Sequence, residues 1–505
     1  MKKKKKKILL GPVITIIILT LSIMIISAIC AALGVSGEIT NINNQSLETS
    51  MVTVKSVFSE EGLKYFLSSP VETFKTFEPL VLLIISLMAI SIGKASGLFK
   101  AVFTPFKKLK PGVVTFLTLF AGIISSFLGE YGFILVLPLA AVVYQYMGRN
   151  SMYGILTAFI GVSMGYGAGL VFNYDDYQLG LLTKAAATID VDENYVFNAW
   201  SNSYAMVAAT FILSIIGTIV VENILKPKVK EAIKEEDELV ISKKGLLFSS
   251  VAFVILLLVF IYSIIPGLPG SGILLDNTQT DYVAQLLGPN APFTDAFAFV
   301  FLIIMMICSG IYGYISKNIK NTNDFSVGLS KEFDNLGYMF ILMFFASLLV
   351  SILNWTNLGT VIASWLISFM SNLEFTGIPL IVTMFLVIII MSFLIPDALT
   401  KWTLASPILV PLFMKANITP DFTQFIFKAA DSVGKGMTPF FVYFIVMLAF
   451  LEKYNNKESN KITVFGTLKL LRPTALIFAV IWFIIVIGFF VIGLPLGPTA
   501  TAPTL

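Results

Sequence analysis

Apolar runs of about 20 residues recur from one end of the chain to the other, and they limit the fold more than any other feature. A helix needs about 20 residues to cross the roughly 30 Å hydrocarbon core of a bilayer. Hydrophobic residues make up 57% of the 505 positions and charged residues only 13%, about half the charged share of a soluble domain. The pattern excludes a soluble enzyme, and it excludes a transmembrane β-barrel, whose strands alternate over about ten residues.

The lack of histidine and the scarcity of cysteine remove several site chemistries. With no histidine in the chain, imidazole acid–base catalysis, Ser-His-Asp hydrolysis and histidine-bound metals are excluded. Cys30 and Cys308 both lie in apolar runs, where cysteine acts as a small hydrophobe. We therefore expect no disulfide, no metal site, no catalytic residue and no cofactor, and the modest net charge of +4 does not point to nucleic acid.

The lysines predict the orientation of the chain in the membrane, because cytoplasmic loops carry an excess of Lys and Arg. Lys2–Lys7 and the loop 226–245 are expected inside, and the glutamate-rich segment 34–78 and residues 175–200 outside. The apolar stretch after Lys7 is too long for a signal-peptide core of roughly 7–15 residues, so 1–33 is predicted as the first span. Further spans are expected at about 79–99, 151–172, 202–225, 246–266, 292–316 and 337–370, with a span and external loop together covering 246–291.

Two more apolar stretches, 112–148 and 378–414, agree with the lysine rule only if each enters and leaves on the same side. Their tips read Ser-Phe-Leu at 126–128 and at 392–394, and each is followed by a Ser-x-Gly-x-Gly break, at 163–167 and 432–436. Repeated elements in opposite orientation are typical of secondary transporters. We expect an all-α polytopic membrane protein of about nine transmembrane helices plus two opposed re-entrant hairpins, with inverted repeats over 79–225 and 292–505, the N-terminus inside and the C-terminus outside.

Ionisable side chains within spans, and broken helices at membrane depth, are candidates for function. Lys428 and Asp431 lie three positions apart, so we expect them to share a helix face and to pair. Trp402, next to Lys401 near the second tip, either stacks on an aromatic ligand or anchors the membrane interface. Asp175 and Asp176 are either site residues or solvated loop acids. The other candidates are polar residues at the tips, in the breaks and in the seventh span: Glu130, Ser163, Asn354, Asp397, Ser432 and Lys435.

Two stretches of the chain resemble a known family, the AbgT family of p-aminobenzoyl-glutamate transporters: Asn354-Trp355-Thr356-Asn357-Leu358-Gly359 and residues 401–439. The second stretch carries Lys401-Trp402, Ser406-Pro407-Ile408-Leu409-Val410-Pro411, Pro420, Asp431-Ser432-Val433 and Thr438-Pro439. The resemblance implies a homodimeric transporter that imports p-aminobenzoyl-glutamate, or exports sulfonamide antimetabolites, at the expense of an H⁺ or Na⁺ gradient across a bacterial cell membrane. The positions it implies in substrate handling are Asp176 (with Asp175 as the alternative), Trp402, Pro420, Lys428, Asp431 and Pro439.

Three places differ from what the resemblance implies. The family usually has an arginine where Lys428 stands, a serine where Leu399 stands, and Thr-Asn where Gly434-Lys435 stands. A lysine lacks the bidentate fork that an arginine offers to a carboxylate or sulfonyl group. Lys435 either puts its ammonium where relatives hold a coupling cation or binds a substrate carboxylate. The expected cargo is p-aminobenzoyl-glutamate or a related small anionic aromatic compound, with dicarboxylates, short peptides or amino acids as the alternative.

Overall fold

The computed structural model describes residues 10–43, 46–230, 238–334, 336–456, 461–500 and 502–505. The predicted inside markers Lys2–Lys7, and part of the loop 226–245, lie outside the described residues. Within them the regular structure is helical apart from one β-hairpin, in which β1 (Ser36–Asn43) pairs antiparallel with β2 (Ser46–Thr53). The predicted all-α class is confirmed, with this hairpin as an addition in the segment after the first span.

Eight helices in the described part of the chain are long and apolar enough to cross a membrane, and a bent pair over 420–453 makes a ninth if it counts as one span. The number agrees with the prediction of about nine membrane helices, but two members differ. The span predicted over 151–172 is the shorter helix Ser151–Met164, and Gly377–Leu394, in a stretch predicted as a hairpin, is long enough to be a span. The eight are α1 (Pro12–Ala32), α4 (Glu78–Ala95), α10 (Ser203–Val220), α11 (Lys243–Tyr262), α13 (Pro292–Ser316), α15 (Gly337–Trp355), α17 (Gly377–Leu394) and α21 (Val464–Ile492).

The two stretches predicted as hairpins each form two helices with a break between them. Helices α6 (Pro111–Ile124) and α7 (Tyr131–Tyr146) flank the 3-10 turn η2 (Ser125–Leu128), and α17 is followed after a short break by α18 (Ala398–Lys415). The glycine breaks also interrupt helices. Helix α8 (Ser151–Met164) ends at the first, and α19 (Pro420–Gly434) continues through η6 (Lys435–Met437) to α20 (Val442–Lys453) at the second.

One predicted span is divided in two. The span predicted over 337–370 is two helices, α15 and α16 (Leu358–Ser371), because Asn357 has a left-handed backbone with φ of 58° that a continuous α-helix does not contain. After the first break the chain forms α9 (Tyr174–Asp190). Asn173 caps α9 by accepting a hydrogen bond from the Asp176 N–H at 2.7 Å, and such caps stabilise helix starts.

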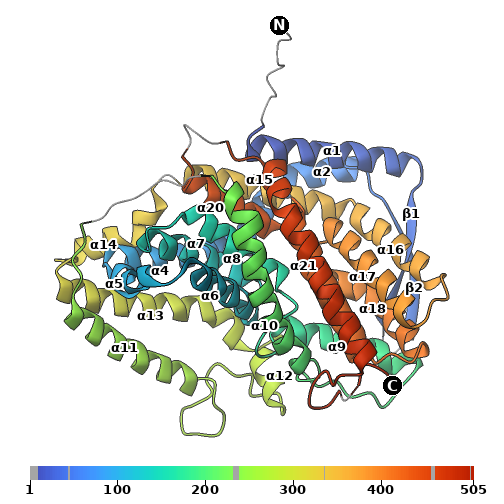
Figure 1. The fold of residues 1–505 in the computed structure, drawn as a ribbon. Coiled ribbons are helices and arrows are strands. Elements are labelled where there is room, and N and C mark those ends of the chain that lie inside the picture. Colours follow the sequence, from blue (N-terminus) through green and yellow to red (C-terminus); the bar gives the residue numbers. More distant parts are fainter. Residues whose placement is uncertain (1–9, 44–45, 231–237, 335, 457–460, 501) are drawn as a thin grey trace.

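Short helices connect the long ones: α2 (Glu60–Ser68), α3 (Pro70–Lys75), α5 (Leu98–Phe103), α12 (Tyr282–Leu287) and α14 (Thr322–Ser330), with single turns η1 (Thr104–Lys108), η3 (Val221–Leu225), η4 (Lys226–Lys228) and η5 (Lys331–Phe333). In Figure 1, α5 and α14 lie at the left-hand end of the molecule and the β-hairpin at the right-hand end.

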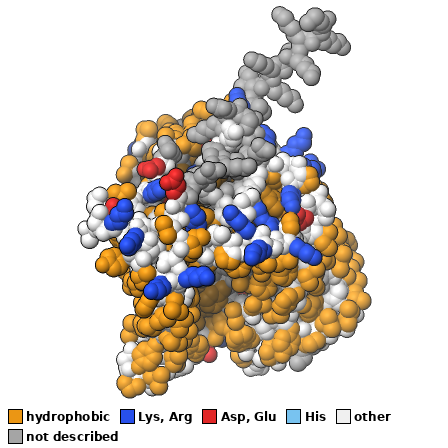
Figure 2. All heavy atoms as spheres, turned by 60° about the vertical axis from the view of Figure 1, so that its left-hand side comes forward, with side chains coloured by type: hydrophobic (Ala, Val, Ile, Leu, Met, Phe, Trp, Pro, Cys, Tyr) orange, Lys and Arg blue, Asp and Glu red, His pale blue; other side chains and the backbone are white. Residues whose placement is uncertain are grey.

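Lysines gather at one end of the helices. Figure 2 looks onto the left-hand side of Figure 1 and shows Lys and Arg side chains above a broad hydrophobic region, with few acidic side chains among them. Exposed lysines follow α5, α10 and α13 (Lys107, Lys226 and Lys317), and another, Lys243, begins α11. Asn318 joins these connections by donating to the Ser96 carbonyl at 2.9 Å and accepting from the Val240 N–H at 3.0 Å. We call this end the lysine-rich face.

A buried carboxylate ties three segments together at the lysine-rich face. Glu332 of η5 contacts Lys94 of α4 through one oxygen and Lys453 of α20 through the other, each at 2.5 Å. Burial raises the pKa of the Glu332 carboxyl, but the two ammonium groups outweigh it and hold the pKa below the ordinary value of 4.5. The stabilisation is therefore fully present above pH 4.5 and is lost as the pH falls through the lower, folded-state pKa.

Glu332→Gln should lower the free energy of unfolding at neutral pH by about 3–5 kcal/mol, since it removes the buried charge that both ammonium groups contact. The difference between wild type and variant should shrink on acidification, because protonation removes the same charge from the wild type. Thermal unfolding of both proteins in detergent, from about pH 7 to about pH 3, measures this difference. A difference that stays constant over that range contradicts the assignment of the effect to the Glu332 charge.

Candidate functional site

The two Ser-x-Gly-x-Gly breaks pack directly on each other. Ser432 Oγ accepts a hydrogen bond from the Gly167 N–H at 2.7 Å, and a Cβ at Gly167 would lie 2.9 Å from that oxygen. In the mirrored contact, a Cβ at Gly436 would lie 1.9 Å from Ser163 Oγ. Both serines are the first residue of the motif and both glycines the last, so the same close approach occurs twice with the repeats exchanged. Only Ser432 accepts a hydrogen bond in it, since Ser163 Oγ has no hydrogen-bond partner among the described residues. This is the arrangement that two inverted repeats produce at their interface.

Gly436→Ala should therefore lower the free energy of unfolding. Overpacking of a protein interior typically costs about 1–3 kcal/mol, and we expect a loss of this size. Ser163→Gly in the same chain should restore much of the loss, because it removes the atoms that the new methyl group meets. Ser163→Ala should restore less, since Ser163 Cβ would remain 3.0 Å away. Thermal unfolding of the single and double variants forms the test, with Ser163→Gly alone as the control; no recovery in the double variant contradicts the contact.

The residues before the last glycines, Tyr166 and Lys435, also meet. Lys435 Nζ lies 3.3 Å from the centre of the Tyr166 ring and 5.4 Å from that of Phe441, and Glu130 Oε1 at the first tip is 3.8 Å away. The lysine is fully buried, and within the described part of the chain its Nζ has no hydrogen-bond acceptor. The Lys435 ammonium is therefore stabilised by two aromatic rings and one carboxylate, and no hydrogen bond to a described residue fixes its position.

Lys428 and Asp431 do not pair with each other, contrary to the sequence prediction. Lys428 Nζ contacts Asp176 Oδ1 of α9, and Asp431 Oδ1 contacts Lys401 Nζ of α18. All four side chains are buried. Both α9 and α18 pack against α19, so each brings a carboxylate or an ammonium to it. An i,i+3 pair on one helix gains only tenths of a kcal/mol, far less than is lost when a buried charge has no partner.

The Lys401–Asp431 pair has a further polar neighbour that the sequence reasoning did not select. Ser392 Oγ at the end of α17 lies 2.8 Å from Asp431 Oδ1 and accepts from Lys401 Nζ at 3.0 Å. Lys401 Nζ also donates to the Pro396 carbonyl at 3.2 Å. Asp431 Oδ2 has no donor in the described residues. The tip motif at 392–394 was the available signal for Ser392.

Trp402 is held inside the protein, so its interpretation as a membrane-interface anchor is wrong. Its side chain is fully buried, its ring centre is 4.5 Å from that of Phe427, and Nε1 donates to Thr183 Oγ1 at 2.9 Å. Thr183 Oγ1 donates to Gln424 Oε1 at 2.8 Å, and Gln424 Nε2 donates to the Asp176 carbonyl at 3.3 Å. The tryptophan is thereby connected to the helix that supplies Asp176.

Asp175 and Asp176 are both buried in the first turn of α9, so their interpretation as solvated loop acids is wrong. A helix N-terminus favours carboxylates, and the two take different partners. Asp176 meets Lys428, while Asp175 accepts a hydrogen bond from the Tyr166 hydroxyl. The sequence alternatives therefore both belong to this site, one in each of two contacts.

Two cavities of about 400 Å³ and 220 Å³ lie beside these charges and share Glu78, Glu130, Asp397 and Tyr443. The larger also has Asp175 and Asp295, and the smaller has Asn354. Glu78 and Asp295 are at the N-terminal ends of α4 and α13, away from the lysine-rich face. Among the described residues no lysine or arginine lines either cavity. We call the two cavities the acidic vestibule; Glu78, Asp295 and Tyr443 were missed from sequence because they come from separate helices.

The remaining candidates occupy different places. Asp397 caps α18 by accepting from the Thr400 N–H at 2.6 Å and is exposed to the vestibule. Pro439 lies in the break between η6 and α20. Pro420 begins α19, eleven positions and about 16 Å of helix before Asp431. The structure therefore does not bring Pro420 to the charged cluster.

The AbgT transporter family model matches residues 4–503. The p-aminobenzoyl-glutamate transport protein of Escherichia coli K12 is 25% identical over 492 residues, which cover 96% of this chain and 93% of the relative. The solved structures to which this chain is similar include the YdaH transporter of Alcanivorax borkumensis, with a TM-score of 0.49 and 23% sequence identity. The match covers 97% of this chain and 100% of that one. They also include MtrF of Neisseria gonorrhoeae, described within a class of antimetabolite efflux pumps (TM-score 0.49, 27% identity, 98% of each chain). Because the family model covers nearly every residue, the chain belongs to the AbgT family of membrane transporters.

Proposed function

We propose that this protein is an ion-gradient-coupled secondary transporter of p-aminobenzoyl-glutamate or a related small anionic aromatic compound. The observation that carries the proposal is the buried Lys428–Asp176 pair, which joins the two repeats close to the Trp402–Phe427 ring pair. A substrate carboxylate has the same chemistry as Asp176 and can replace it at Lys428, and the rings offer an aromatic surface when the helices separate. The relative named a p-aminobenzoyl-glutamate transport protein supports this cargo.

Coupling to an ion follows from the charges at the site. Three buried lysines (Lys401, Lys428 and Lys435) face four acids (Glu130, Asp175, Asp176 and Asp431). Burying an uncompensated charge costs several kcal/mol, so an additional anion has to be accompanied by a cation. The acidic vestibule attracts cations and repels anions. We propose it as the path by which the coupling cation reaches the site.

The membrane placement is part of the proposal. Because cytoplasmic segments are rich in Lys and Arg, we propose that the lysine-rich face is cytoplasmic. Residues 1–33 would then be the first span, with the N-terminus inside and the C-terminus outside a bacterial cell membrane. The pairs within 112–148 and 378–414 then enter from opposite faces, as re-entrant hairpins of the inverted repeats 79–225 and 292–505. A homodimer is proposed from the family resemblance, and the mass of the detergent-purified protein tests it.

Lys435→Asn should change the ion dependence of transport. In the unmutated protein the Lys435 ammonium fills a space between Tyr166, Phe441 and Glu130, and we propose that it replaces a coupling metal ion, so Na⁺ gradients should have no effect. The asparagine variant leaves room and an oxygen ligand, so its transport should require Na⁺. Lys435→Met is the matched control, because it removes the charge without supplying an oxygen. Na⁺-dependent transport by the unmutated protein contradicts the proposal.

The deciding experiment for the function is flux of labelled p-aminobenzoyl-glutamate across proteoliposome membranes, measured in each direction with H⁺ and Na⁺ gradients imposed separately. We expect flux driven by an H⁺ gradient and in the direction of H⁺ movement, because substrate and coupling cation are proposed to occupy the site together. No flux through protein that is folded in the same liposomes rejects this cargo. Competition by dicarboxylates, short peptides or amino acids would then identify the alternative cargo.

A further inference from the structure

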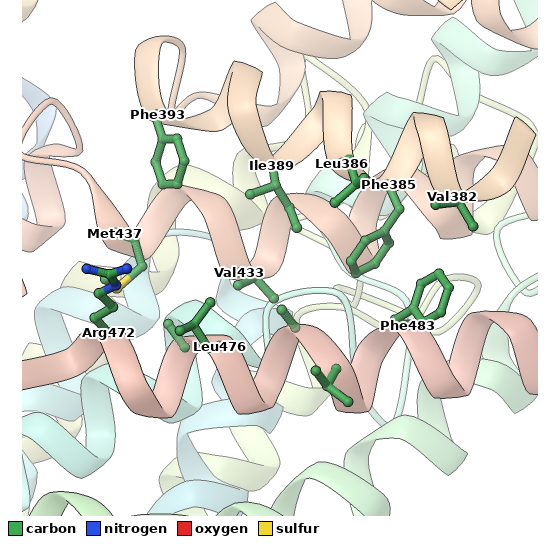
Figure 3. Close-up of a pocket in the computed structure, with 13 residues that line it drawn as sticks. Val382, Phe385, Leu386, Ile389, Phe393, Val433, Met437, Arg472, Leu476 and Phe483 are labelled. Atoms are coloured by element: carbon green, nitrogen blue, oxygen red, sulfur yellow. The ribbon is translucent and has the colours of Figure 1, made fainter. Parts of the chain in front are cut away.

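A groove of about 560 Å³ runs between α17 and α21 on the outside of the helix bundle. Figure 3 shows Val382, Phe385 and Leu386 on one wall and Leu476 and Phe483 on the other. The rim residues Leu386 and Leu476 are 55% and 58% exposed, so the groove opens to the surroundings of the helices. Its lining is apolar apart from one residue, and Val433, Met437 and Ala479 form part of it.

The exception is Arg472, which lies at one end of the groove beside Met437 (Figure 3). It is exposed, and among the described residues it has no hydrogen-bond or ion-pair partner. Arg472 lies eight residues, about 12 Å, after the first residue of α21. The 29 residues of this helix make it about 43 Å long, which is more than the roughly 30 Å of the hydrocarbon core. The guanidinium is therefore expected at the level of the lipid headgroups on the lysine-rich side.

We propose that the groove binds an anionic phospholipid of that leaflet, with the phosphate on Arg472 and an acyl chain along the apolar walls. A guanidinium without a partner at headgroup depth can bind a phosphate through charge-assisted hydrogen bonds. The apolar groove that continues from it can hold an acyl chain of the same lipid molecule. No acidic residue lines the groove in the described part of the chain. The ammonium of a zwitterionic lipid would thus find no counter-charge, and basic sites between membrane helices favour anionic headgroups.

The position of the groove gives such a lipid a route to the transport machinery. Val433 and Met437 belong to the wall of the groove and also to the second break, where Val433 is flanked by Ser432 and Gly434. A bound acyl chain would pack against the segment that also carries Lys435. We therefore infer that occupancy of the groove restrains this break and that the stability of the protein depends on the lipid.

Lipid retention by the purified full chain tests the proposal, using phosphatidylglycerol and phosphatidylcholine with the same acyl chains. Native mass spectrometry and thermal unfolding should show phosphatidylglycerol retained over phosphatidylcholine and raising the melting temperature. Arg472→Gln should lose this preference. Lys469→Gln should keep it, because it removes a charge from the same helix outside the groove lining. Ala479→Phe should lower retention of both lipids, since the ring occupies the groove.

Several results would overturn the proposal: equal retention of the two lipids by wild type, or an unchanged preference in folded Arg472→Gln. If Arg472→Gln does not fold, Ala479→Phe decides, and undiminished lipid retention by that variant rejects the site. A second copy of the chain is the other possible occupant. Leu476→Cys that forms an intermolecular disulfide in membranes would assign the groove to that copy. None of these measurements uses a substrate, so their failure leaves the proposed transport function standing.

Discussion

Asp431→Asn should abolish transport and also destabilise the protein by about 3–5 kcal/mol, because it leaves Lys401 buried without its carboxylate. Loss of transport in this variant alone therefore cannot separate a mechanistic role from a structural one. The double variant Lys401→Met/Asp431→Asn removes both charges and keeps a side chain that can accept from Ser392. We expect it to recover most of the stability, as replacement of whole buried pairs often does, and still not to transport.

Melting temperature in detergent and flux in proteoliposomes are the two measurements, made on the two single variants and the double variant. Ser392→Ala is the matched control, since it removes a neutral neighbour of the same pair and leaves both charges. We expect this control to retain flux at reduced stability. Flux through the double variant would mean that the pair only supports the fold, and Asp431 would then leave the transport mechanism.

The Lys428–Asp176 pair predicts changes of opposite sign in substrate binding. Lys428→Met should weaken equilibrium binding of an anionic substrate by about 30-fold or more, the loss expected when one partner of a buried charge contact is removed. Asp176→Asn should instead leave binding equal or tighter, because the substrate carboxylate no longer competes with Asp176 for the ammonium. Transport coupled to the ion should stop in both variants. Lys428→Met removes the contact for the substrate, and Asp176→Asn removes the carboxylate that we propose takes up a proton when the substrate displaces it.

Binding of labelled p-aminobenzoyl-glutamate to the detergent-purified variants separates these effects from transport. Lys428→Arg is the conservative control, because it keeps the charge and adds a bidentate fork for a carboxylate, so its binding should be retained. Equal weakening in Lys428→Met and Asp176→Asn would show that the pair maintains the shape of the site. In that case the substrate carboxylate would have to be placed elsewhere, with Lys435 as the next candidate.

Several parts of the structure could be predicted from the chain because they depend on local properties. The length of an apolar run decides whether a helix can span a bilayer, and closely spaced glycines weaken a helix locally. The two glycine breaks were found in this way, and the structure shows that they contact each other through Ser163, Gly167, Ser432 and Gly436. The broken seventh span was missed because hydropathy does not detect the left-handed Asn357.

The sequence by itself determined the class of protein, the approximate number of its membrane helices, the repeat and most of the charged candidates. Only the tertiary structure decided which charges meet. Lys428 takes Asp176, which is 252 positions away, in place of Asp431 three positions away, and the acidic vestibule collects Glu78, Glu130 and Asp397 from three regions of the chain. Ion pairs and cavity walls depend on contacts of a few ångströms between side chains, and such contacts are set by which helices pack as neighbours.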